Sequence, residues 1–293
     1  MSDSFALVKA SIASTLDKLL PTNSAIAQPM IGAMRHAVLG GGKRMRPLMT
    51  CAACEAFSGT YKPSLPVACG FEFIHAYSLI HDDLPSMDND DLRHGQPATH
   101  IAFGEATAIL AGDSLHSLAF QSLAEASDIS ESARLRCITL LSTAAGWPGM
   151  AGGQCLDIAA EGQELTLAEL EALHAAKTGA LIEASLVVGG YCAEVPPGDT
   201  RLALLAQFGA RIGLAFQVVD DILDVTESSA TLGKPAGSDE SLQKNTFPKL
   251  MGLDAASKRA DDLLEESLAL LNQADLATEL LKAIATKAVK RRY

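Results

Sequence analysis

The chain has 293 residues, a formal net charge of −12 and 48% hydrophobic residues, which excludes a disordered or fibrous protein. Aromatic residues make up only 5% of it, which disfavours a β-rich sandwich or barrel. The acidic excess argues against nucleic acid as a partner, because neutralising phosphates requires clustered Lys and Arg. At first sight it also argues against an anionic substrate.

Helical periodicity dominates the chain. We expect helices over residues 4–20, 25–39, 47–57, 64–83, 104–126, 131–146, 166–190 and 199–225, and two or three more after residue 239. Thr166 and Glu169 have the spacing of a capping box at the start of one of them. No low-complexity linker or break in composition occurs. The sequence therefore predicts an all-α protein with a single domain over residues 1–293.

The sequence also carries signals about the cellular compartment. Its first residues lack the pattern of a signal peptide, and no run of 18 apolar residues occurs, so we expect a cytoplasmic protein without a membrane anchor. Cys51 and Cys54 form a C-x-x-C pair. Because no second pair or neighbouring His completes a zinc site, two buried thiols on a helix are the favoured interpretation.

The first of two aspartate-rich segments reads HDDLPSMDNDD and covers residues 81–91. Asp82 lies near the end of an otherwise apolar helix. An ideal helix would turn Asp88 well away from the face that carries Asp82. We therefore expect Leu84-Pro85 to bend the chain at this point.

The second segment, DDILD, covers residues 220–224. Asp220 and Asp224 are four residues apart and project from one helix face, which Gln217 shares. Two carboxylates about 4 Å apart repel by roughly 4 kcal/mol at an effective dielectric constant near 20, so such clusters need a cation. Carboxylates without a Cys- or His-rich set favour Mg²⁺ bound together with substrate phosphates. Either cluster alone could still be a solvated helix end.

A basic segment, GGGKRMRP, covers residues 40–47 and gathers three cations on a flexible turn before a helix. Its glycines permit close backbone approach, and a helix N-terminus attracts anions. A plain surface turn would explain the glycines but not the cations. Further candidates for anion binding are Arg93 and the Lys177-Thr178 pair, whereas Lys234 and Lys244 could each be an ordinary surface lysine.

The acidic and basic segments together explain how a protein with a net negative charge could bind an anionic substrate. A phosphate-bearing substrate could be bridged to the aspartates by Mg²⁺. A second anionic group would be held directly by Lys43, Arg46 and His75. The apolar helices around these residues could house a hydrocarbon tail.

These segments, together with GGQCLD at residues 152–157 and FQVVDDILD at residues 216–224, resemble the trans-isoprenyl diphosphate synthase family, specifically its bacterial farnesyl diphosphate synthase group. The similarity runs from about residue 25 to at least residue 250. It implies the all-α isoprenoid synthase fold around a deep central cavity, usually in a homodimer. It also implies head-to-tail condensation of isopentenyl diphosphate with dimethylallyl or geranyl diphosphate through an allylic carbocation.

The resemblance implies roles for individual residues as well. The positions that bind three Mg²⁺ ions are Asp82, Asp88 and Asp220, with Asp83, Asp221 and Asp224 in the outer shell. The positions on the side of the allylic substrate are Arg93, Lys177, Thr178, Gln217, Lys234 and Lys244. The isopentenyl diphosphate positions are Lys43, Arg46 and His75. Asp82, Asp88, Asp220 and Lys177 would take part directly in catalysis.

Two further positions carry predictions. Tyr77 lies five residues before Asp82, about 7.5 Å along a helix, and the family uses a bulky residue there, next to Ser78, as a floor under the growing chain. This predicts a fifteen-carbon product, although an ordinary core tyrosine is the rival interpretation. His94 stands where bacterial relatives usually have a second Arg. A histidine with an ordinary pKa of about 6.5 loses its positive charge as the pH rises. We therefore expect the affinity for isopentenyl diphosphate to fall with rising pH.

Three alternatives stay open. The first is a geranyl or geranylgeranyl diphosphate synthase. The second is a terpene cyclase, which Lys43 and Arg46 disfavour because a cyclase has no isopentenyl substrate to bind. The third is a non-catalytic subunit of a heteromeric synthase, which the two intact aspartate segments disfavour.

Overall fold

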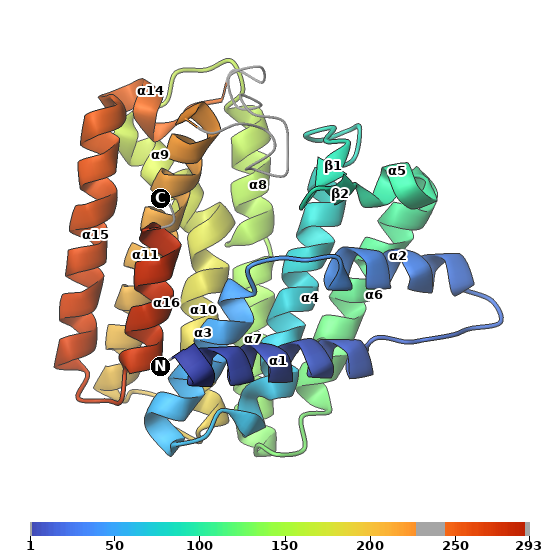
Figure 1. The fold of residues 1–293 in the computed structure, drawn as a ribbon, viewed down its shortest axis with the longest axis horizontal. Coiled ribbons are helices and arrows are strands. Elements are labelled where there is room, and N and C mark those ends of the chain that lie inside the picture. The colour runs from blue at the N-terminus through green and yellow to red at the C-terminus, as the bar shows by residue number, and fades with distance from the viewer. Residues whose placement is uncertain (1, 227–243, 291–293) are drawn as a thin grey trace.

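The computed structural model describes residues 2–226 and 244–290, and their regular structure is almost entirely helical (Figure 1). The predicted all-α class is therefore confirmed. The strands among these residues are β1 (Leu92–Arg93) and β2 (Gln96–Pro97), which pair antiparallel. The helices are α1 (Ser2–Leu19), α2 (Gln28–Leu39), α3 (Met45–Ser58), η1 (Lys62–Ser64), α4 (Leu65–Asp82), α5 (Thr99–Phe103), α6 (Glu105–Ala124), α7 (Glu131–Ala145), α8 (Met150–Ala159), α9 (Leu167–His174), η2 (Ala175–Gly179), α10 (Ala180–Cys192), α11 (Thr200–Thr226), α14 (Phe247–Met251), α15 (Leu253–Gln273) and α16 (Glu279–Val289).

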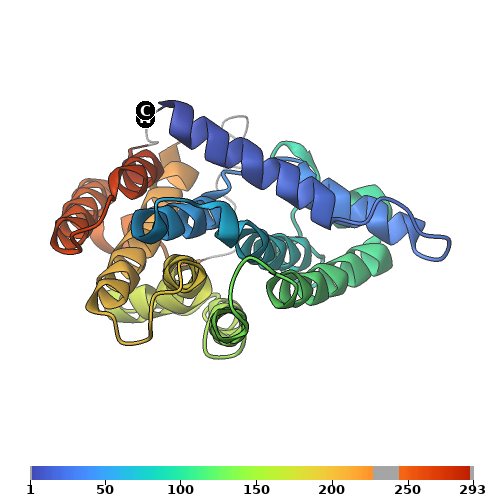
Figure 2. The ribbon, with the colours of Figure 1, turned by 90° about the horizontal axis from the view of Figure 1, so that it is seen from below.

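Helix α4 is central to the arrangement. It is apolar on nearly all sides, as a helix surrounded by other helices should be. It packs against α6, α3 and α10, and Gly70 permits the approach to α6, because a Cβ there would lie 2.3 Å from Leu123. Seen from below, most helices are viewed end-on and α1 lies across them (Figure 2). One cluster of buried hydrophobic side chains extends from Val8 to Val289.

The helix predicted over residues 166–190 contains an irregularity that the sequence did not reveal. Its start is confirmed, since the backbone N–H of Thr166 donates to Glu169 and the Thr166 hydroxyl accepts from the Glu169 backbone N–H. Between α9 and α10, however, η2 is a π-helical turn, and it carries Lys177 and Thr178. Such turns often mark functional sites, because they change the direction in which side chains project.

Helix α8 was missed by the sequence analysis. Its segment contains Gly152 and Gly153, which disfavour a helix in isolation. Packing explains why the helix forms: a Cβ at Gly153 would lie 2.3 Å from the backbone nitrogen of Lys177. The glycine therefore lets α8 lie directly against η2, and tertiary contact outweighs the weak local propensity.

Helix α11 is long and apolar enough, by length and composition, to cross a membrane. It packs against both α10 and α15, and half of its most apolar window is buried. The core helix of a globular protein meets the same criterion. We therefore assign α11 to the protein core.

The C-x-x-C pair lies on α3, where Cys51 and Cys54 are both buried and not in disulfides. Burial raises the pKa of the Cys51 thiol to about 12. A thiol with this pKa stays protonated at neutral pH and is a poor metal ligand. The prediction of two ordinary buried thiols is confirmed.

Candidate active site

The first aspartate segment folds back on itself at the end of α4. The helix ends at Asp82, and the backbone N–H of Asp88 donates to the carbonyl of Asp82 at 2.8 Å. Asn89 follows with a positive φ of 53°, which continues the turn. The predicted bend at Leu84-Pro85 is therefore confirmed. It returns Asp88 to the level of Asp82, which an unbroken helix would not allow.

The electrostatics of this turn favour a cation. The pKa of Asp82 is raised to about 6, chiefly by burial and also by the carboxylates of Asp88 and Asp83, which together outweigh the opposing charges of Lys177 and Arg93. Within residues 2–226 and 244–290, no three His, Cys, Asp or Glu side chains converge as a ready-made metal cage. Mg²⁺ is usually held by one or two carboxylates plus substrate phosphates, so this donor set fits that ion.

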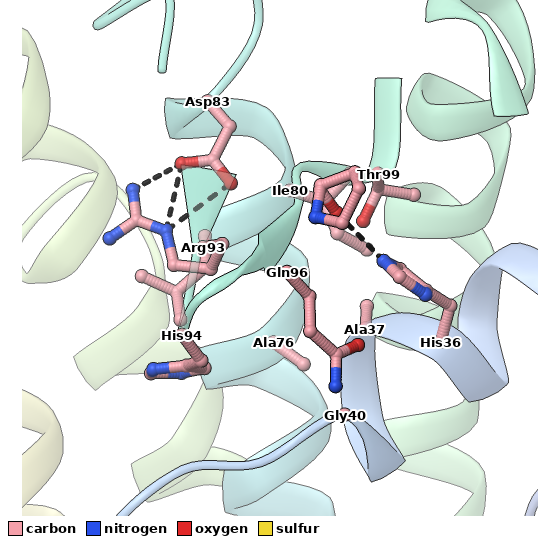
Figure 3. Close-up of a pocket in the computed structure, with 12 residues that line it drawn as sticks. His36, Ala37, Gly40, Ala76, Ile80, Asp83, Arg93, His94, Gln96 and Thr99 are labelled. Atoms are coloured by element: carbon pink, nitrogen blue, oxygen red, sulfur yellow. Dashed lines mark hydrogen bonds and ion pairs between the residues drawn. The ribbon is translucent and has the colours of Figure 1, made fainter. Parts of the chain in front are cut away.

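Arg93, on β1, is bound to the same turn. Its Nε donates to Asp83 Oδ1 at 2.9 Å, and a second nitrogen also donates to Asp83 (Figure 3). The same nitrogen contacts Asp90. Asp83 is 2% exposed, so this pair fixes the hairpin to the end of α4. His94 and Gln96 extend from the hairpin beside Gly40 and line a small pocket of about 30 Å³.

A chain of ion pairs links η2, α8 and the first aspartate segment. Lys177 Nζ donates to Asp157 Oδ2 at 2.5 Å, and Lys244 Nζ lies 3.0 Å from Asp88 Oδ1 and 3.9 Å from Asp157. Burial alone would raise the pKa of Asp157, but Lys177 and Lys244 outweigh it and hold the pKa below its ordinary value. Two predicted lysines are thus brought together by a carboxylate that the sequence analysis did not select. Its only signal was the GGQCLD segment.

The second aspartate segment lies within the continuous helix α11. Asp221 is buried and accepts from Gln217 Nε2 and from the backbone N–H of Phe247, each at 3.0 Å. The Thr178 hydroxyl in turn donates to Gln217 Oε1 at 3.2 Å. Asp221 therefore joins α11 to the start of α14 and sets the orientation of Gln217. Asp224 is also buried.

The residues of the basic segment lie in different surroundings. Gly41 and Gly42 have φ values of 139° and 111°, which only glycine adopts readily, and a Cβ at either would contact His94. Lys43 is exposed and its Nζ lies 5.1 Å from the centre of the Phe216 ring. Arg44, which was not selected as a site residue, forms a 2.6 Å ion pair with Glu72.

Arg46 and His75 line the same cavity as Asp82. Burial lowers the pKa of Arg46, although Glu72 and Asp220 act in the opposite direction. Its Nε is buried and has no hydrogen-bond partner among the described residues. Burial, followed by the charge of Arg46, holds the pKa of His75 well below its ordinary value. Arg46 and His75 share this cavity with Asp82 because α3 and α4 pack against each other.

The cavity has a volume of about 420 Å³ and lies between α4, α8 and η2. Its wall comprises Arg46, His75, Tyr77, Ser78, Leu79, His81, Asp82, Met87, Met150, Ala151, Gln154, Cys155, Ile158, Lys177 and Thr178. The Tyr77 ring makes edge contacts with His81 and with His116, whose centroids lie 5.4 and 5.2 Å away. The charged groups and the apolar groups thus share one cavity. Lys234, the remaining predicted residue, lies outside the described residues.

The polyprenyl synthetase family profile matches residues 28–286. The chain belongs to the polyprenyl synthetase family. It is 46% identical over 268 residues to the farnesyl diphosphate synthase of Escherichia coli, covering 90% of this chain and 89% of that one. The structure also superimposes on the geranyltransferase of Helicobacter pylori, crystallised with magnesium and isoprenyl diphosphate, with a TM-score of 0.87 and 33% identity over 99% and 96% of the two chains.

Membership of this family makes the protein a prenyltransferase with the isoprenoid synthase fold, as the sequence predicted. Overall identity does not separate product lengths within the family. A large subunit of a heterodimeric geranylgeranyl pyrophosphate synthase from Arabidopsis thaliana is also 46% identical, over 90% of this chain and 72% of its own. Individual residues of this polyprenyl synthetase must therefore carry the argument about product length.

Proposed function

We propose that the protein is a farnesyl diphosphate synthase, which condenses isopentenyl diphosphate with dimethylallyl and then geranyl diphosphate. The observation that carries this proposal is the cavity itself. Asp82, Lys177 and Arg46 border it and could act on a diphosphate there, and Tyr77 borders it five residues before Asp82 on α4. The farnesyl diphosphate synthase relatives support the same substrates.

The carboxylates have a defined role in this proposal. Asp82, Asp88 and Asp220 would hold three Mg²⁺ ions with the diphosphate, while Asp83, Asp221 and Asp224 orient the surrounding groups. Mg²⁺ bound there supplies positive charge that stabilises the departing diphosphate. The raised pKa of Asp82 supports this assignment, because its carboxylate gains most from a cation.

The cationic side chains act on the two substrates. Lys177 and Lys244 already converge on Asp157, so they would approach the allylic diphosphate as a positioned pair. Arg93 and Lys234 are assigned to the same diphosphate, and Thr178 and Gln217 to the carbon where positive charge develops. The allylic C–O bond breaks with its electron pair leaving on diphosphate, and the double bond of isopentenyl diphosphate attacks the cation.

The second substrate requires an anion site of its own. We assign its diphosphate to Lys43, Arg46, His75 and His94. The unpartnered Nε of Arg46 supports this, since a buried guanidinium nitrogen normally donates a hydrogen bond. Loss of a proton then completes the product, and the apolar walls exclude water that would quench the cation.

Tyr77 is the residue on which the product length depends. Its ring lies on the cavity wall and is fixed by His81 and His116, so it can limit the length of the chain below Asp82. We expect Tyr77→Ala to shift the product from fifteen to twenty or more carbons, measured by chromatography of the dephosphorylated products. Tyr61→Phe, remote from the cavity, is the control. An unchanged fifteen-carbon product from Tyr77→Ala would contradict the assignment.

The overall activity is tested by incubating purified protein, Mg²⁺ and isopentenyl diphosphate with each allylic starter. Farnesyl diphosphate from both dimethylallyl and geranyl diphosphate is expected, whereas geranylgeranyl diphosphate would favour the alternative.

We also propose a single-domain, cytoplasmic homodimer. The continuous core from Val8 to Val289 supports the single domain, and light scattering tests the dimer.

A further inference from the structure

The side-chain amide of Gln154, in the middle of α8, lies in an unusual environment. Its Nε2 and Oε1 are both buried, and neither has a hydrogen-bond partner among the described residues. A buried amide normally forms hydrogen bonds, because leaving it unpaired costs free energy of folding. The unpaired amide therefore points to a partner that is not part of the folded chain.

The position of Gln154 indicates what that partner is. Gln154 lines the cavity and lies three residues before Asp157, the carboxylate that binds Lys177. Three helical residues correspond to about 4.5 Å along the axis. Both α4 and α8 run toward the end of the molecule where β1 and α14 lie (Figure 1), so Gln154 lies about one turn below Asp157, whose carboxylate binds the Lys177 ammonium.

The backbone around Gln154 is held rigidly. Gly153 packs against the backbone of Lys177, where even a methyl group would clash. Gln154 therefore keeps a fixed position relative to Lys177, the lysine that the proposed function assigns to the allylic diphosphate. In a bound allylic diphosphate, the atoms one turn below the phosphates are the first carbons of the chain, where positive charge develops.

We propose that Gln154 is a further catalytic residue, whose side-chain carbonyl contacts the reacting end of the allylic substrate and stabilises its positive charge. This inference rests on the proposed function. When the C–O bond breaks, the electron pair leaves with diphosphate and the allylic carbons become cationic. A preorganised amide dipole in an apolar cavity stabilises such charge effectively, because nothing has to reorient during the reaction.

The test is Gln154→Met, which keeps the length of the side chain and removes the amide. We expect kcat for the condensation of geranyl diphosphate to fall 10- to 100-fold, with KM for geranyl diphosphate changed less than threefold. The melting temperature should rise, because the unpaired amide is gone. Gln163→Met is the matched control, since Gln163 is exposed, and it should leave kcat unchanged.

A second measurement separates charge stabilisation from packing. 2-Fluorogeranyl diphosphate forms a less stable cation, so the ratio of its rate to that of geranyl diphosphate should be smaller in Gln154→Met than in the wild type. A kcat within twofold of wild type, or an unchanged ratio, would overturn the proposal. If Gln154→Met does not fold, Gln154→Leu serves instead. Wild-type protein that condenses neither starter would overturn the proposed function itself, whatever the variants do.

Discussion

The two aspartate segments resemble each other in sequence, but they have different structural surroundings. In the first, α4 ends at Asp82, which borders a cavity of about 420 Å³, and a turn brings Asp88 back beside it. In the second, the aspartates stay within α11, and Asp221 gives both of its oxygens to protein donors.

The comparison shows that burying an aspartate can either stabilise the fold or prepare a site for a cation. Asp221 is buried and its hydrogen bonds hold two helices together, so its charge is satisfied by the fold itself. Asp82 is half-buried, and the cost of its burial outweighs the nearby charges of Lys177 and Arg93, so its pKa rises to about 6. A carboxylate of this second kind reduces stability until a cation arrives, which is a property expected of a binding residue and not of a structural one.

Asp82→Asn tests the binding side of this comparison and should have the largest effect. We expect kcat to fall by about 10²- to 10³-fold, because charge stabilisation of the leaving group is lost. Steady-state kinetics with geranyl diphosphate measures this. Asp91→Asn, at an exposed position in the same segment, should stay within twofold of wild type.

The same variant has an opposite effect on stability in metal-free buffer. The folded-state pKa of Asp82 lies above its ordinary value of 3.8, so ionisation costs folding free energy as the pH rises from 3.8 to about 6. At pH 8, Asp82→Asn should therefore be more stable than wild type by about 1–3 kcal/mol in urea unfolding. Below pH 4 the difference should vanish, and a variant less stable at pH 8 would contradict this account.

Asp221→Asn tests the structural side of the comparison. An asparagine cannot accept both hydrogen bonds, so either Gln217 or the backbone N–H of Phe247 loses its acceptor. We expect a loss of about 1–3 kcal/mol in the free energy of unfolding. Asp262→Asn, which removes an exposed pair with Lys258, should cost less than about 0.5 kcal/mol. Equal losses in the free energy of unfolding for Asp221→Asn and Asp262→Asn would show that the hydrogen bonds of Asp221 do not stabilise the fold.

Much of this could be predicted from the sequence, because helix periodicity and clustered charge are local signals. The bend after Asp82 followed from Pro85, and the capping box at Thr166 was readable directly. Asp157 and Gln154 were not found, since two adjacent glycines weaken the local helix signal of α8, and its packing against η2 is a tertiary contact. The shared cavity of Arg46 and Asp82 depends on how α3 packs against α4, which no local pattern specifies.

His94 is attached to the first segment through the hairpin that Arg93 fixes, and it provides the smallest expected effect. Partial burial, followed by the charges of Arg93, Arg44 and Lys43, lowers the pKa of His94 below 6.5. The imidazole of the free protein is therefore mostly neutral at pH 7, and less of it is charged than the sequence alone suggested.

A bound diphosphate would favour the charged imidazole and raise this pKa again, so binding of isopentenyl diphosphate should take up a proton. Between the pKa values of the free and bound states, KM for isopentenyl diphosphate should rise with pH. The rise should be about three- to tenfold from pH 5.5 to 8 in the wild type, and His94→Arg should flatten it, because arginine stays charged throughout. His36→Arg, at a histidine on α2 that bonds to the carbonyl of Pro97, should leave the wild-type profile intact. Parallel profiles for wild type and His94→Arg would show that the imidazole does not contact the diphosphate, and the hairpin would then act only through Arg93.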